Sequence, residues 1–312
     1  MRTIPILTVF LAAVLVAGPL MPLWLVFLLT VAFAKGLVVL GLLVMMRTGL
    51  VSFGQGLYYG LGAYAAGLAA NFLGVTDAIA LVALGGIVSA TAGYLLGFVM
   101  VRYREIFFAM LSLALSMILY GILVRSAVLG STDGFNLPPP SFFGLTFDSQ
   151  TGRLLLYALT MVMATGTAML LHRFVNSPAG VIGEAILTNE IRVEYLGTSV
   201  AGVLHLTYVI GATTSGLGGA LIAIAAGHID PDLAYWTTSG EFVFVAIMSG
   251  IGHVAAPLLG MAVFEAIRSF AFQYSPYTWQ MVVGLSMLAV ILFLPSGLWS
   301  LFTRRHRAGG AA

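Results

Sequence analysis

Long, uninterrupted apolar segments fill most of this 312-residue chain and leave it few ways to fold. A helix needs about 20 residues to cross the hydrocarbon core of a bilayer. A barrel strand would instead alternate apolar and polar residues. The segments, bounded by glycine, proline and charge, run roughly over residues 4–20, 23–46, 50–71, 78–101, 106–129, 153–172, 203–227, 240–272 and 278–301. Their length and continuity predict membrane-crossing helices, because a helix satisfies its backbone polar groups within itself.

Composition agrees with a chain that is solvated mainly by lipid. Hydrophobic residues make up 60% of the sequence and charged residues 8%, whereas soluble proteins are about 25% charged. The chain has no cysteine, which excludes disulfides, thiol catalysis and cysteine metal sites. We therefore expect an all-α, polytopic transmembrane bundle of about 8 to 10 spans, with residues 1–312 as a single domain.

The arginines predict the topology. They lie between or beyond the apolar segments, and the excess of Lys and Arg in cytoplasmic loops then places both termini inside. Nine simple spans would leave the termini on opposite sides. The segment 240–272 is too long for one span and is interrupted by Gly250 to His253 and by Pro257, so we expect it to cross twice or to re-enter. The arginines used are Arg2, Arg47, Arg102, Arg104, Arg173, Arg192, Arg304, Arg305 and Arg307.

Two loops are long enough to have roles of their own. The predicted external loop, about residues 130–152, contains three consecutive prolines that cannot continue a helix, and it is either a connector or a docking surface. The predicted cytoplasmic loop, about residues 174–201, contains an amphipathic helix from Ser177 to Gly197 that is too short and too charged to cross. Ser177 is a good N-cap, Pro178 suits the first helical position, and Gly197 is a good helix stop.

This short cytoplasmic helix is acidic. It carries Glu184, Glu190 and Glu194 against Arg192 alone. Helices that lie on a lipid surface favour Lys and Arg on their polar face. The pattern therefore favours docking to another protein over resting on the membrane.

The chain lacks an ATPase site of its own by sequence. A Walker A loop needs a lysine that reaches the phosphates, and the single lysine, Lys35, lies in an apolar stretch. No nucleophile and base can be placed together, and His205, His228 and His253 are too scattered for a metal site. We expect a transport subunit rather than an enzyme, with no cofactor in this chain.

The segment Gly49 to Tyr64 is unusually rich in glycine for a span, and it has two possible roles. Gly56 and Gly60 form a small-xxx-small pair, which favours close helix packing. Polar side chains beside the glycines favour a solute pathway, because transporters hold solutes at exposed backbone. The candidate pathway residues are Ser52, Gln55, Gly56, Tyr58, Gly62 and Tyr64.

Charged residues inside apolar segments form another candidate set, since a charge in lipid is costly and usually faces protein or water. Glu265 and Arg268 have the i, i+3 spacing of a helical ion pair. Lys35 either snorkels or pairs with a carboxylate. Arg125 and Glu241 complete the set.

Several stretches together resemble one family, the LivM-like permeases of branched-chain amino acid ABC transporters. They are Gly49 to Tyr64, Ala185 to Glu190 with Glu194 and Gly197, Ser215 to Leu221, Ser239 to Gly260, and Pro295 to Leu298. The resemblance implies a bacterial inner-membrane permease that pairs with a second homologous permease. It also implies two cytoplasmic ATPases that bind ATP and magnesium, a periplasmic binding protein that delivers the solute, and no nucleic acid partner.

By the same resemblance, residues 177–197 are the element that contacts the ATPase. Asn189, Glu190 and Gly197 match the family pattern, and the chain departs from it at Val181, Glu184 and Leu187, where such loops are commonly rich in arginine. The expected coupling residues are Glu184, Ala185, Ile186, Asn189, Glu190, Arg192, Glu194 and Gly197.

Two alternatives remain open. The same type of permease also serves urea, short amides and aromatic acids. A stand-alone secondary transporter or channel would move its solute with no ATPase present, although the intramembrane acids are too few to form an obvious ion relay.

Overall fold

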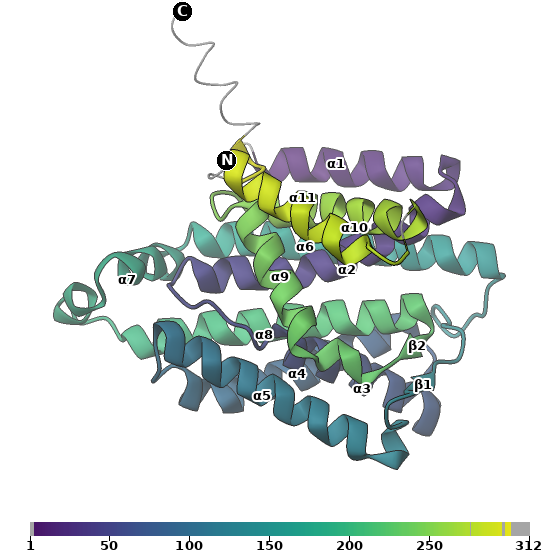
Figure 1. Ribbon diagram of the computed structural model, residues 1–312, viewed down its shortest axis with the longest axis horizontal. Helices are drawn as coiled ribbons and strands as arrows, with labels where there is room; N and C mark the ends of the chain where they lie inside the picture. Colours follow the sequence, from purple (N-terminus) through teal and green to yellow (C-terminus); the bar gives the residue numbers. More distant parts are fainter. Residues whose placement is uncertain (1–2, 275, 295–296, 301–312) are drawn as a thin grey trace, which may run out of the picture.

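The computed structural model describes residues 3–274, 276–294 and 297–300, and helices that run lengthwise side by side make up most of it (Figure 1). One end of the bundle carries α7, and the opposite end carries the short strands β1 and β2; we name them the α7 end and the sheet end. The helices are α1 (Thr3–Ala17), α2 (Leu23–Met46), α3 (Gln55–Phe72), α4 (Ala78–Met100), α5 (Glu105–Arg125), α6 (Ser149–Val175), α7 (Pro178–Tyr195), α8 (Val200–Ala226), α9 (Trp236–Ser249), α10 (Ala256–Tyr274) and α11 (Trp279–Phe293).

The all-α, polytopic fold class is confirmed. Helices α2, α4, α5, α6 and α8 are each long and apolar enough to cross a bilayer, while Ile4–Leu20 and α11 are shorter apolar helices. The predicted external loop contributes Phe135–Asn136, which pairs antiparallel with His228–Ile229. This two-stranded sheet joins the loop after α5 to the loop after α8.

The long apolar segment 240–272 is broken, as its glycines predict. Helix α9 ends at Ser249, Gly250 has a φ of +87°, and α10 begins at Ala256. The N-terminus of α1 and the C-terminal end of α11 both lie at the α7 end of the bundle (Figure 1). The terminal arginines Arg304, Arg305 and Arg307, and residues 295–296, lie outside the described residues.

A further break precedes α9, and the apolar pattern does not reveal it. After β2 the chain forms a short 3-10 helix, η3 (Pro231–Ala234), that turns back into the bundle. The Ser116 hydroxyl of α5 donates to the Ala234 carbonyl at 2.8 Å. A Cβ on Gly60 of α3 would lie 3.0 Å from the Ala234 Cβ. The irregular backbone is therefore covered by protein, as membrane depth requires.

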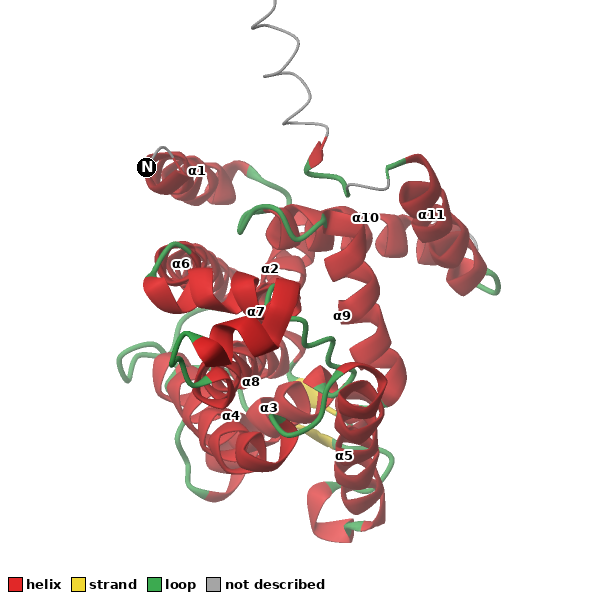
Figure 2. Ribbon diagram, turned by 90° about the vertical axis from the view of Figure 1, so that its left-hand side faces the viewer, coloured by secondary structure: helices red, strands yellow, loops and turns green. Residues whose placement is uncertain are grey.

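The centre of the bundle is α8, which lies among α2, α3 and α4 (Figure 2). Glycines allow these helices to approach backbone to backbone. A Cβ on Gly62 of α3 would overlap the backbone of Gly216 of α8, and a Cβ on Gly219 would overlap the Tyr59 carbonyl. The four helices consequently form a closely packed block.

Candidate functional site

The candidate pathway residues lie in the loop before α3 and along α3, inside the packed block. The Ser52 hydroxyl accepts the Gly54 N–H at 3.2 Å. The Gln55 side chain accepts the Ser215 hydroxyl at 2.6 Å, and its Nε2 lies 3.0 Å from the sulfur of Met45. Ser52 and Gln55 are both fully buried, so their polar atoms bond within the protein.

Further along α3 the same pattern continues. The Gly56 N–H donates to the Ser239 hydroxyl of α9 at 2.8 Å. The Tyr58 hydroxyl donates to the Tyr208 hydroxyl of α8 at 2.7 Å. Gly62 contacts the α8 backbone, as described above. These residues connect α3 to two other helices and are interior contacts in this conformation.

Tyr64 differs from the other candidates, because its buried hydroxyl has no hydrogen-bond partner among the described residues. Its ring packs edge-on against Phe135 of β1, with centroids 5.7 Å apart. The residue therefore lies toward the sheet end, where α3 meets the loop that contains β1.

The second candidate site is α7, whose ends match the sequence prediction. Ser177 is extended, Pro178 occupies the first helical position, and Gly197 has a φ of +80°. The Ser177 hydroxyl donates to the Phe174 carbonyl at 2.6 Å and makes no cap hydrogen bond to the first turn of α7. The prediction that Ser177 caps the helix is therefore wrong.

The prediction of one continuous helix over 177–197 is wrong. Asn189 is extended, with φ −162° and ψ 101°, and it kinks α7. Its side-chain oxygen accepts the Arg192 N–H at 3.0 Å, which caps a second short helix. Asparagine competes with the helical backbone for hydrogen bonds, which accounts for a break at this residue. We name residues 178–188 the first arm and residues 190–195 the second arm.

The first arm rests on the end of α2. A Cβ on Gly183 would lie 2.7 Å from the Thr48 side chain, so the arm fits closely there. An Arg47 nitrogen lies 3.4 Å from a Glu184 oxygen, and the Glu184 side chain is 66% exposed. This ion pair is long and exposed, so it holds the arm weakly.

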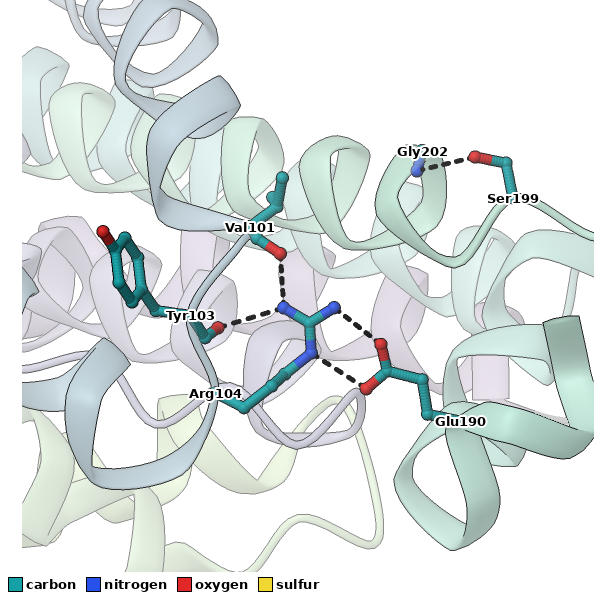
Figure 3. Close-up of polar contacts among 6 residues, drawn as sticks. All are labelled: Val101, Tyr103, Arg104, Glu190, Ser199 and Gly202. Carbon is teal, nitrogen blue, oxygen red and sulfur yellow. Dashed lines mark hydrogen bonds and ion pairs between the residues drawn. The ribbon is translucent and has the colours of Figure 1, made fainter.

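The second arm is held by a stronger contact to the turn between α4 and α5 (Figure 3). Arg104 binds Glu190 through two parallel bonds, from Nε at 2.9 Å and from a terminal nitrogen at 2.7 Å. The other terminal nitrogen of Arg104 donates to the carbonyls of Val101 and Tyr103. Val193 is buried in the same apolar cluster as Val101.

This contact shifts the titration of Glu190. The hydrogen bonds from Arg104 lower the pKa of the carboxyl below its usual value, partial burial opposes that change, and the charge of Arg104 adds to the lowering. The carboxylate is therefore charged at neutral pH and stays bound to the guanidinium. In the sequence, Arg104 served only to assign the cytoplasmic side of the membrane. Its pair with Glu190 was not predicted, because the two residues are 86 positions apart and form no local pattern.

Exposed side chains of the α7 segment are apolar as well as acidic. Tyr195 is 88% exposed and Leu196 82% exposed. Of the expected coupling residues, Ile186 is buried and Glu190 is half-buried, while Glu184, Ala185, Asn189, Arg192, Glu194 and Gly197 are exposed. We name the exposed large apolar side chains of the segment the α7 patch; they are Val181, Leu187, Ile191, Tyr195 and Leu196.

The intramembrane charges form pairs. Lys35 pairs with Glu265 at 2.5 Å, and Arg268 lies 3.7 Å from the same Glu265 oxygen and 3.4 Å from Glu241. The predicted i, i+3 pairing is thus present, and Lys35 pairs with a carboxylate. Arg125 is an exposed residue at the end of α5.

Comparisons with known proteins agree with one another. A family model described as "Branched-chain amino acid transport system / permease component" matches residues 24–291. The branched-chain amino acid permease protein LivM of Salmonella typhimurium is 26% identical over 286 residues, which cover 84% of this chain and 67% of LivM. BraD of Pseudomonas aeruginosa is 25% identical over 80% of this chain and 86% of its own length. LivH of Escherichia coli is 27% identical over 33% of each chain. No solved structure matches.

Proposed function

Because this chain belongs to the family of branched-chain amino acid transport permease components, we propose that it is the membrane-spanning subunit of an ATP-binding-cassette importer. It forms the pathway for branched-chain or other amino acids together with a second homologous permease. A periplasmic binding protein delivers the solute, and two separate cytoplasmic subunits hydrolyse ATP. The chain resides in the bacterial inner membrane with both termini in the cytoplasm, and it binds no cofactor itself.

The architecture of α7 is the observation that supports this proposal most strongly. A subunit driven by an external ATPase needs an element that is exposed to the partner on one side and fixed to the spans on the other. The α7 patch is exposed, most of all at Tyr195 and Leu196, and a group of exposed large apolar residues marks a protein interaction site. On the other side, Glu190 holds the second arm to the turn between α4 and α5, and the first arm packs against Thr48 beside the weaker Glu184 ion pair.

The two arms of α7 connect to different parts of the bundle. Closure of the ATPases pushes the second arm, and Arg104 passes that displacement to the turn between α4 and α5. The first arm passes it to the end of α2. A cavity of about 140 Å³ lies between the first arm and the turn after α9, lined by Arg47, Glu184, Leu187, Ile251 and Gly252. That cavity leaves space for the first arm to move toward the turn.

The proposal is tested by docking and transport with purified components. The double substitution Tyr195→Ser and Leu196→Ser removes two residues of the α7 patch, and we expect it to reduce ATPase binding at least tenfold. Phe143→Ser is the matched control, because Phe143 is 84% exposed in the external loop. ATPase binding is measured by co-purification, and solute uptake in proteoliposomes.

Two outcomes would contradict the proposal. One is solute accumulation by this chain in proteoliposomes that contain no ATPase. The other is unchanged ATPase binding and uptake in the Tyr195→Ser, Leu196→Ser variant, which would mean that α7 does not contact the ATPase.

A further inference from the structure

Four charged side chains meet inside the bundle where α2, α9 and α10 adjoin, and the two ion pairs among them differ in accessibility. Lys35 and Glu265 are 2.5 Å apart, and their side chains are 11% and 10% exposed. Arg268 and Glu241 are 3.4 Å apart, and their side chains are 34% and 30% exposed. The pair of Lys35 and Glu265 is therefore buried, whereas the pair of Arg268 and Glu241 is longer and partly exposed. We name the partly exposed pair the open pair.

The cluster lies deep in the bundle rather than at its ends. Lys35 is near the middle of the 24-residue α2, and Glu265 is at the middle of the 19-residue α10. Arg268 comes one turn after Glu265, yet its guanidinium points back toward Glu265 and Glu241. It is thus not reaching for the end of the helix, as a snorkelling side chain would.

An open charged pair at this depth does not face lipid. Charged side chains in the hydrocarbon region are costly and face the protein interior or a water-filled cavity. The open side of Glu241 and Arg268 must therefore meet water or protein in the assembled complex. The solute pathway that the proposed function requires offers both water and protein surface.

Aromatic residues border the open pair. Phe244 follows Glu241 by three residues and Phe272 follows Arg268 by four, so each lies on the same side of its helix as the charge. They are 50% and 59% exposed. Trp279 of α11 lies beside Arg268 and Phe272, with the Arg268 guanidinium 5.4 Å from its ring centre and the Phe272 ring at 6.3 Å. The open pair therefore has an apolar border.

We propose that Glu241 and Arg268 bind the two charges of a zwitterionic amino acid on its way through the permease. The Glu241 carboxylate accepts the ammonium group, the Arg268 guanidinium binds the solute carboxylate, and Phe244 and Phe272 contact an apolar side chain. This inference rests on the proposed function and narrows its substrate class. Urea and short amides carry neither charge, and aromatic acids lack the ammonium group.

The test uses the complete reconstituted complex of both permeases, the ATPases and the binding protein. Each neutral variant, Glu241→Gln and Arg268→Gln, removes one charge at similar side-chain size. We expect each to lower the initial rate of leucine uptake about tenfold or more, because a charge-assisted bond is lost. ATP hydrolysis stimulated by the loaded binding protein should persist. Arg125→Gln, a charge change at the end of α5, should leave uptake unchanged.

A charge exchange separates solute binding from a merely structural ion pair. The double variant Glu241→Arg, Arg268→Glu keeps an ion pair but inverts its orientation. Because the exchange puts a second carboxylate beside Glu265, we expect it to recover only part of the thermal stability that the neutral variants lose, while leucine uptake stays at least tenfold low. Restored uptake in the exchange variant, or normal uptake in both neutral variants, would overturn the inference. Failure of the proposed function is distinct, because the unaltered complex would then show no ATP-dependent uptake.

Discussion

Two helix contacts in this molecule are built in opposite ways. The first joins α3 to α8, and the second joins α7 to the rest of the bundle. At the first, glycines bring two backbones together, because a Cβ on Gly62 of α3 would overlap the backbone of Gly216 of α8, and a Cβ on Gly219 would overlap the Tyr59 carbonyl. At the second, α7 packs through side chains, with Gly183 close against Thr48 and Val193 buried beside Val101, and the ion pairs of Arg47 and Arg104 add to this contact. The first contact depends on the absence of side chains, whereas the second depends on apolar side chains and charges.

The difference indicates which parts can move. A closely packed backbone contact has no free volume, so it transmits displacement as a rigid body. Partly exposed ion pairs contribute little free energy each, so they can break and form again. We infer that α2, α3, α4 and α8 move together and that the adjustable contacts are those of α7.

The largest effect is expected from filling the backbone contact. In Gly216→Val the added atoms meet the α4 backbone, which cannot shift without separating the helices, so we expect no folded subunit to be recovered in detergent. Size-exclusion chromatography measures the yield. Gly121→Val on α5 is the control, because a Cβ there has no neighbour within 4 Å. Normal recovery of Gly216→Val would show that the block is loosely packed.

The next largest effect is expected from breaking the buried ion pair of Lys35 and Glu265. Lys35→Met leaves Glu265 buried with its remaining ion-pair partner, Arg268, at a longer distance of 3.7 Å, and we expect a loss of about 3 kcal/mol in the free energy of unfolding. The midpoint of thermal unfolding in detergent measures the change. Adding Glu265→Gln removes the uncompensated charge and should recover most of the loss. A double variant as unstable as the single one would indicate that Lys35 acts through packing.

Features that depend on local pattern could be predicted from the sequence. The apolar segment 23–46 coincides with α2, and the break in 240–272 falls at the predicted Gly250. Ser177, Pro178 and Gly197 mark the ends of α7. Each of these is determined by the conformational preference of a few adjacent residues.

Features that depend on distant contacts could not be predicted. The turn of η3 back into the bundle relies on Ser116 and Gly60, and the pairing of Arg104 with Glu190 joins two loops. The kink at Asn189 is local, yet asparagine also occurs inside helices, so the residue alone did not reveal it. The pathway role of the α3 candidates stays a prediction, because small and polar residues serve both close helix packing and solute contact.

The Arg104–Glu190 pair should affect coupling more than stability. Arg104→Gln releases the second arm, and we expect the number of solute molecules imported per ATP to fall severalfold, while the free energy of unfolding changes by about 1 kcal/mol or less. Uptake and ATP hydrolysis are measured together in proteoliposomes. The exposed neighbour Arg102 supplies the control Arg102→Gln. The exchange Arg104→Glu, Glu190→Arg should restore part of the coupling, and a fully coupled Arg104→Gln variant would show that this pair transmits nothing.

The smallest effect is the pH dependence of the same pair. The pKa of Glu190 is lowered in the folded state, chiefly by its hydrogen bonds to Arg104, from an ordinary value of 4.5. Its contribution to stability is therefore complete above about pH 4.5 and is lost as the pH falls through the lower, folded-state pKa. Because both side chains are about one third exposed, we expect less than about 1 kcal/mol. The unfolding midpoints of the unaltered protein and of Glu190→Gln should differ at pH 7 and converge below pH 4.5. A difference that persists under acid conditions would mean that Glu190 stabilises α7 through packing, and the second arm would then be as rigidly attached as α3 is to α8.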